Sequence, residues 1–535
     1  MADDNSFMAD DNKEKNFDRL MASQGPTGLS APKALERIGL LIDLSGDLAR
    51  EDGTARALLW ADELERGSLS AADAALLEYF RGNAWANRQK QRHADRSTVW
   101  AWEQPELQQQ LLHLRSAVQH DGFGELPDLR QCQVLTNLAN QINTVGRFVE
   151  AQEYWNRALR IKPRFGMALG NRGYGLAEYA RALYDPGHQR VLLCHAHASL
   201  SQAVSGEAEY EGPGYDGAKA LFASTQNQIA ARIDVGEVER TLDLDGHELG
   251  ASEGERAYRL WCLHNTLFLN PLNDLAPHQI AARDTLHLPP FVTPIEELRA
   301  LLGLFNQMKQ EFVAARWLYY DGMQADGVHF ADRDVSLYNT LDYPSYSIAV
   351  EKVKAAYRVA YSLFDKIAFF LNAYLDLRLD EARVYFRGVW YVNADRNRGM
   401  RPELDQSENW PLRGLYWLAK DLFDENFHDV TEPDAQALYL IRNRLEHRYL
   451  KVHEIYTPPA AEPNAAERMW IDHLAYSVQR QDFEAKTLRV LRLARAGLLY
   501  LSLAMRREES RRAKDKGTTR TVPMNLDLWK DDWKR

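Results

Sequence analysis

The chain has few cysteines, and none are spaced for a disulfide framework. Cys132, Cys194 and Cys262 are the only three in 535 residues, and no CxxC occurs. This usage is typical of a reducing compartment, where buried thiols stay free. Residues 194–197 read Cys-His-Ala-His, but no second pair of ligands follows at zinc spacing. We therefore predict no metal site.

Long apolar runs are also missing. The most apolar stretches, Ala368–Leu375 and Gly497–Met505, are much shorter than the ~18–20 residues that cross a bilayer. The N-terminus, MADDNSFMADDN, is acidic and polar, unlike a secretory or mitochondrial signal. We expect a cytoplasmic protein with no membrane partner.

The motifs of cofactor-dependent and metal-dependent enzymes are missing as well. There is no glycine-rich phosphate loop, no HExxH, no GxSxG and no acidic two-metal cluster. We expect no cofactor. The net charge of −11 excludes a uniformly basic nucleic-acid coat. Residues 345–516 nevertheless carry 28 Lys and Arg against 25 Asp and Glu, so an anionic partner is expected there.

The composition is that of a large, soluble, mostly helical protein. Hydrophobic residues make up 45% and charged residues 26%, with modest glycine and proline. Apolar residues recur at helical spacing along most of the chain, so we predict an all-α fold. Breaks in this pattern divide the chain into a disordered leader (1–30), a helical-repeat region (32–235), a bridging helical segment (240–335), a C-terminal helical bundle (343–510) and a basic, aromatic tail (511–535).

Residues 132–165 form a 34-residue frame with the features of a helix pair. Gly146 falls at the turn between the helices, and Pro163 follows the second one. Small residues recur where the helices would touch, and Trp155 would fill the neighbouring groove. The frame resembles the tetratricopeptide (TPR) pattern. We interpret residues 32–235 as an irregular TPR-like array with a protein or peptide ligand; the alternative is packed helices that match by chance.

The bundle is predicted from four long helical patterns. They cover Ile348–Leu379, Leu415–Phe423, Thr431–Lys451 and Ala485–Arg507. Proline-rich residues 457–463 mark a loop before the last one, because prolines so placed cannot continue a helix. Four such helices make a bundle.

The helix predicted over Thr431–Lys451 holds the strongest candidate site. It starts with Thr-Glu-Pro-Asp, a typical cap and first turn. Its apolar stripe consists of Leu438, Ile441, Leu445, Tyr449 and Val452. At about 100° per residue, His447 lies opposite this stripe and Asn443 lies one turn earlier on the same side. Arg442 lies at the edge of the stripe, about 140° from His447.

This helix brings together the groups that RNA cleavage needs. His447 and Asn443 stand among three guanidiniums, those of Arg442, Arg444 and Arg448. Guanidinium binds phosphate through forked N–H donors and stabilises negative charge. Imidazole transfers protons near neutral pH. One histidine per chain serves one proton transfer, so two copies that face each other across a homodimer are the economical arrangement.

Arg442-Asn443-Arg444-Leu445-Glu446-His447 resembles the R-x4-6-H motif of the HEPN superfamily. The context, a late helix of an all-α bundle, is also similar. The resemblance implies a metal-independent endoribonuclease whose site forms at a homodimer interface of the C-terminal bundle, often in toxin or anti-phage defence systems. It also implies that Arg442 stabilises phosphate, that His447 does acid–base work, and that Asn443 orients one of them.

The resemblance leaves other roles open. Arg444, Arg448 and Lys366 are candidates for binding RNA. Asp365 and Lys366 either line the same cleft or form an ordinary charged break in an apolar helix. In the alternative function, the bundle of a helical-repeat scaffold only dimerises or binds nucleotide or RNA; it could also be the target of a modifying transferase.

Three further patterns carry expectations of their own. The motif helix itself could be a solvated face on which Glu446 pairs with Arg442. Arg489, Arg492 and Arg495 form a basic row that is either solvated or in contact with the RNA backbone. His453 is expected to continue the motif helix in an exposed position.

Overall fold

The structure is a computed structural model of the chain. It describes residues 3–93, 100–212, 214–405, 407–423, 435–455, 472, 474–515, 522–524, 526–527 and 529–534. Within these ranges the protein is helical apart from one two-stranded sheet, so the all-α prediction is confirmed. No helix in them is long and apolar enough to cross a bilayer.

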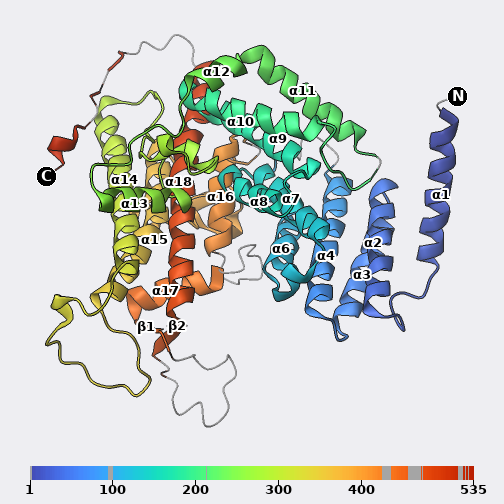
Figure 1. The fold of residues 1–535 in the computed structure, drawn as a ribbon, viewed down its shortest axis with the longest axis horizontal. Helices are drawn as coiled ribbons and strands as arrows, with labels where there is room; N and C mark the ends of the chain where they lie inside the picture. Colours follow the sequence, from blue (N-terminus) through green and yellow to red (C-terminus); the bar gives the residue numbers. More distant parts are fainter. Residues whose placement is uncertain are drawn as a thin grey trace.

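The first half of the chain is a curved array of helices, drawn in blue to green in Figure 1. Its elements are α1 (Asp3–Met21), α2 (Ala31–Asp47), α3 (Glu51–Glu65), α4 (Ala71–Arg92), α6 (Pro105–Gln119), α7 (Asp128–Thr144), α8 (Phe148–Ile161), α9 (Gly166–Ala182), α10 (Pro186–Val204), α11 (Asp216–Arg232) and α12 (Val235–Thr241). Neighbouring helices pack against each other, most closely α9 with α10, α4 with α6, and α7 with α8.

The turn between α7 and α8 lies where the 34-residue frame predicts it. Gly146 adopts a φ of 88°, a conformation that glycine enters without a steric penalty. Trp155 of α8 is buried, and its Nε1 donates to Asn140 Oδ1 at 3.0 Å. A Cβ on Gly175 of α9 would lie 2.5 Å from the Trp155 ring. Trp155 thus fills the groove between neighbouring helices.

The leader differs from the prediction. Residues 3–21 form α1 instead of a disordered segment, and one aromatic residue explains why. Phe17 is fully buried, with the Arg50 guanidinium 4.5 Å from its ring centroid. A Cβ on Gly53 of α3 would lie 2.4 Å from the ring, so the absent side chain makes room for it. The leader is polar in composition, so its sequence did not indicate that one aromatic side chain, Phe17, packs into the core.

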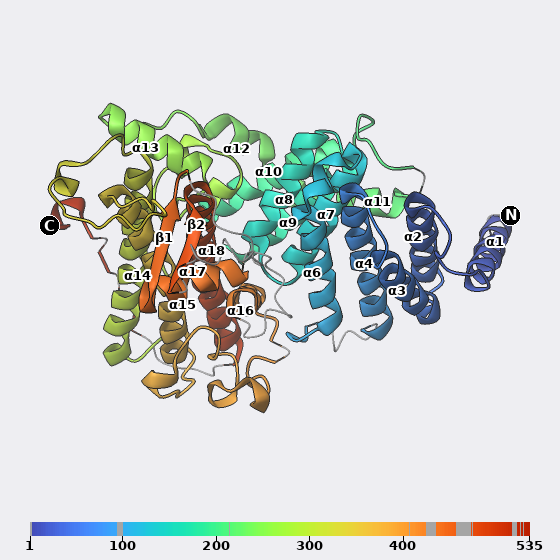
Figure 2. The same cartoon turned by 90° about the horizontal axis from the view of Figure 1, so that it is seen from below.

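The second half of the chain is built around long helices that lie side by side (Figures 1 and 2). Its elements are α13 (Glu253–His264), α14 (Ile295–Met323), α15 (Ile348–Tyr374), α16 (Trp410–Phe423), α17 (Ala435–His447), β1 (Tyr449–His453), β2 (Ala475–Gln479) and α18 (Arg480–Asp515). α15 packs between α14 and α18, and α16 covers the other side of α18.

The motif helix ends earlier than predicted. It stops at His447, and residues 449–453 form β1, which pairs in parallel with β2. His453 is fully buried, and its Nε2 lies 3.2 Å from Ser477 Oγ of β2. The expectation of a longer helix with an exposed His453 is therefore wrong. The predicted start at residues 431–434 and the proline-rich loop lie outside the described residues.

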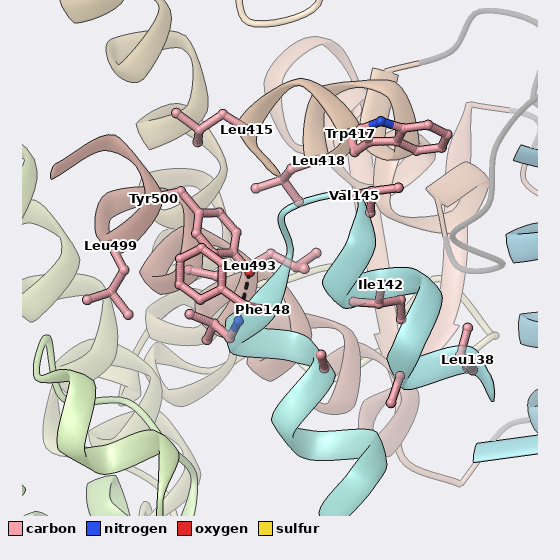
Figure 3. Packing of buried hydrophobic residues seen from close by; sticks show 14 of the residues in the cluster. Leu138, Ile142, Val145, Phe148, Leu415, Trp417, Leu418, Leu493, Leu499 and Tyr500 are labelled. Carbon is pink, nitrogen blue, oxygen red and sulfur yellow. Dashed lines mark hydrogen bonds between the residues drawn. The ribbon is translucent and has the colours of Figure 1, made fainter. Parts of the chain in front are cut away.

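The array packs directly onto the C-terminal helices. Figure 3 shows Phe148, at the start of α8, against Tyr500 of α18, while Val145 lies next to Leu418 of α16. The rings of Phe148 and Tyr500 have centroids 5.0 Å apart. A Cβ on Gly414 of α16 would lie only 2.3 Å from the carbonyl oxygen of Gly146. The two backbones touch, and both halves share one apolar core.

The basic row on α18 faces this interface. Arg495 is buried, and its Nη1 pairs with Asp274 Oδ1 at 2.6 Å. Arg489 Nη2 lies 3.0 Å from Glu150 Oε1 of α8. Arg492 Nε donates to the Asn265 carbonyl at 3.0 Å. Arg495 is buried and Arg489 and Arg492 are partly buried, so the reading of this row as a solvated face is wrong. All three guanidiniums are held by acids or carbonyls of the protein.

Candidate active site

The apolar stripe of α17 fixes how the motif is presented. Leu438, Ile441 and Leu445 are buried against the bundle. The hydroxyl of Tyr357 on α15 donates to the Leu438 carbonyl at 2.6 Å. This contact ties α17 to α15, so the remaining residues of the motif turn towards the helix edge and the surface.

Arg442 is partly buried beside Asn443. Its Nη1 donates to Asn443 Oδ1 at 3.1 Å. Within the part of the chain that the structure describes, no carboxylate lies within ion-pair distance of Arg442, and exposed Glu446 does not pair with it. The reading of this face as an i, i+4 ion pair is not realised there.

The positive charge of Arg442 acts on two groups of α15, partly buried Asp365 and buried Tyr361. Burial raises the pKa of the Asp365 carboxyl, while the Phe386 N–H, which donates to Asp365 Oδ1 at 3.1 Å, and the Arg442 guanidinium oppose the rise. Burial also raises the pKa of Tyr361, and the positive charge of Arg442 again opposes it. Of the two readings of Asp365, the structure favours the one that places it beside the motif.

His447 is exposed at the carboxyl end of α17. In the described ranges, no hydrogen bond or ion pair holds its imidazole. Arg442 lies roughly 7.5 Å away along the helix axis and about 140° around it. Within one chain, the two groups therefore point in different directions.

Of the three residues predicted to bind RNA, Arg444 and Arg448 lie within or beside the motif and Lys366 does not. Arg448 is exposed next to His447, and Arg444 Nη1 donates to the Leu474 carbonyl at 3.1 Å, which ties α17 to the start of β2. Lys366 pairs with Glu311 of α14. This salt bridge crosses the interface between α14 and α15. The Lys366 side chain therefore lies on the α14 side of α15, away from the motif residues on α17.

Sequence reasoning missed Tyr361 as a neighbour of Arg442. Tyr361 and Asp365 are four residues apart and so share one face of α15. This i, i+4 spacing could have indicated that Tyr361 lies beside Asp365 and hence near Arg442. It was hidden because Tyr361 also fits the apolar stripe of α15, where it is buried.

The Cys-His-Ala-His segment forms no metal site. In the described residues, no group of three His, Cys, Asp or Glu side chains lies close enough to hold a metal ion. Cys194 is buried, which raises the pKa of its thiol to about 11. Burial, with the charges of Arg172 and His278, lowers the pKa of His195 to about 4. Both residues belong to the helical packing of the array.

An all-α bundle that presents Arg442 and His447 on a late helix is the arrangement of an HEPN domain. Residues 292–508 match the family model described as LA2681-like HEPN, which supports membership of this domain in the HEPN superfamily. The match begins at residue 292 and so includes α14, which the sequence pattern places in the bridging segment. No curated protein and no solved structure matches the chain significantly.

Proposed function

We propose that the protein is a metal-independent endoribonuclease of the HEPN type, with the N-terminal array as its TPR-like regulatory or sensor region. The observation that carries this proposal is the Arg442–Asn443 pair beside Asp365, with His447 exposed on the same helix inside the matched domain. A role in toxin or anti-phage defence is part of the proposal.

The chemistry requires two proton transfers and a cation. A base removes the 2′-hydroxyl proton of RNA, and the 2′-oxygen attacks the adjacent phosphorus. Arg442 stabilises the extra negative charge on the phosphoryl oxygens. An acid then protonates the 5′-oxygen as the P–O5′ bond breaks. The products are a 2′,3′-cyclic phosphate and a 5′-hydroxyl, and His447 takes part in one or both transfers.

A homodimer supplies a second copy of each group. Since His447 and Arg442 point in different directions within one chain, a phosphate between two α17 helices could contact Arg442 of one subunit and the imidazole of the other. Arg448, exposed beside His447, would then hold the RNA backbone.

The test is cleavage of a labelled RNA in EDTA by the full chain and by His447→Ala and Arg442→Ala. We expect a 2′,3′-cyclic phosphate product from the wild type and a loss of about 10²–10⁴-fold in each variant. Light scattering reports the oligomeric state of each protein. Equal cleavage by all three proteins would reject the enzyme and leave the noncatalytic scaffold.

A further inference from the structure

A polar cavity lies outside the α17 motif. It has a volume of about 710 Å³ and opens between the loop that follows α15 and the outer face of α16. Small-molecule sites are typically about 300–1,000 Å³, so a ligand as large as a nucleotide fits. Its described walls come from residues 383–397 and from Tyr416, Ala419 and Lys420 of α16.

Positive charge dominates these walls. The cations are Arg383, Arg387, Arg396 and Lys420. The carboxylate among the described lining residues, Asp395, already has partners: its Oδ1 accepts from the Asn397 N–H at 3.0 Å, and its Oδ2 lies 3.5 Å from Arg398 Nε. Several guanidiniums around one space favour an anion with several oxygens, such as a phosphate.

Aromatic rings form the rest of the cavity. Trp390 and Tyr416 are buried, with ring centroids 5.8 Å apart in an edge-to-face arrangement. The hydroxyls of Tyr391 and Tyr416 lie 3.4 Å apart. Tyr385 is 38% exposed, so part of its ring remains accessible to a ligand. Stacking on such a ring is how proteins hold an unpaired base.

Hydrogen bonds within the loop hold its two ends and its tip together. Its two arms are joined by the Val392 N–H, which donates to the Gly399 carbonyl at 3.1 Å. At the tip, Asn393 and Ala394 have φ values of 54° and 59°, a region that residues other than glycine rarely adopt. The Tyr385 hydroxyl donates to the Ala394 carbonyl at 3.0 Å and holds this tip in place.

The cavity wall is connected to the motif through one residue. Phe386 lies between the lining residues Tyr385 and Arg387, and its N–H donates to Asp365, whose carboxyl feels the charge of Arg442. A ligand that moves this wall therefore also moves a neighbour of Arg442.

We propose that this cavity binds one nucleoside phosphate, with the phosphate among the arginines and the base against Tyr385. The proposal goes beyond RNA cleavage, because none of the described lining residues belongs to the motif on α17. The same chemistry could belong to a free nucleotide or to one nucleotide of an RNA strand, and two probes separate these sources.

The experiment measures binding to full-length protein carrying His447→Ala, so that cleavage does not consume the probe. One probe is adenosine 5′-monophosphate, followed by calorimetry, and the other is a short fluorescein-labelled single-stranded RNA, followed by anisotropy. In this background, Arg383→Glu/Arg387→Glu should weaken binding at least ~10-fold, because it removes charge-assisted contacts to phosphate. Tyr385→Ala should weaken it about 5-fold or more.

The control is Arg66→Glu/Arg232→Glu, which makes the same change in net charge at exposed positions of the array. It should bind both probes like the parent. Circular dichroism checks that the cavity variants are folded, and Tyr385→Ala tests the site without a change in charge. Binding of the monophosphate identifies a free nucleotide as ligand, and binding of RNA alone identifies a strand.

Two results overturn the proposal. One is that neither probe binds; the other is that both cavity variants bind as well as the control. Failure of the nuclease proposal is recognised separately, because it rests on cleavage by the wild type and not on binding to the inactive protein.

Discussion

Asp421 on α16 and Arg115 on α6 form an ion pair with 2.6 Å between Oδ2 and Nη1, and both side chains are almost fully buried. Arg147, at the turn before α8, contacts the same carboxylate oxygen and also donates through Nη2 to Glu150 Oε1 at 2.7 Å. Glu150 in turn holds Arg489 of α18. A chain of charges thus crosses from the array into the HEPN domain.

Removing the central carboxylate should destabilise the protein strongly. Asp421→Ala leaves two arginines buried without their shared partner, so the free energy of unfolding should fall by about 3–5 kcal/mol. Urea denaturation followed by tryptophan fluorescence measures this change. The control is Asp62→Ala, whose exposed carboxylate pairs with Arg81 and should contribute less than ~1 kcal/mol. Equal effects of the two variants would contradict the buried network.

The contact between two glycines makes a steric prediction. A Cβ on Gly414 would lie 2.3 Å from a backbone oxygen of Gly146, so Gly414→Ala should force the array and α16 apart. We expect a loss of about 1–3 kcal/mol in stability. Gly303→Ala is the matched control: it lies exposed on α14 with open space around it and should stabilise by about 0.5–1 kcal/mol. Thermal unfolding should shift in opposite directions for the two variants.

His195 predicts how stability depends on pH. Its pKa is lowered to about 4 in the folded protein, whereas the unfolded chain has the ordinary value of 6.5. Between these values the unfolded state binds more protons, so stability falls as the pH drops from 6.5 towards 4. Partial exposure limits this contribution to about 1–2 kcal/mol.

The measurement compares the wild type with His195→Asn at pH 7.0 and pH 5.5, a range in which few carboxyls titrate. The variant should lose less stability than the wild type over this range. An equal loss of stability in both proteins would show that groups other than His195 cause the pH dependence.

The guanidinium fork of Arg442 should matter beyond its charge. Arg442→Lys keeps the charge but loses the forked geometry and the contact with Asn443, so cleavage in EDTA should fall about 10–100-fold. Lys366→Ala is the comparison, since its ion pair with Glu311 lies at the α14–α15 interface. That variant should cleave at the wild-type rate. A loss of cleavage in Lys366→Ala would restore the sequence-based expectation that this lysine binds RNA.

Much of the helical fold could be predicted because helical periodicity is local information. The bridging segment predicted to be helical contains α14, and the pattern predicted from Ile348 became α15. β1 was missed because Val452 suits both periods: it continues the spacing of Leu445 and Tyr449 on a helix, and on a strand it shares a face with buried Leu450. The pairing of these residues with β2, which is distant in sequence, selects the strand over the helix.

The site was predictable in part for the same reason. The neighbours Arg442 and Asn443 and the exposed His447 follow from positions on one helix. Partners that are distant in sequence did not follow: Arg495 and Asp274 pair across two segments, and nothing near either residue indicates the other. The cavity beside α16 was equally hidden, since its loop wall, residues 383–397, lies between the helical patterns predicted over Ile348–Leu379 and Leu415–Phe423.

The backbone contact between Gly146 and Gly414 has a thermodynamic consequence. α16 carries this contact as well as Tyr416 and Lys420 of the cavity. A molecule that binds the array and displaces the turn before α8 must also displace α16, and hence alter affinity at the cavity. Linkage makes the effect reciprocal: occupancy of the cavity changes the affinity of the array by the same factor.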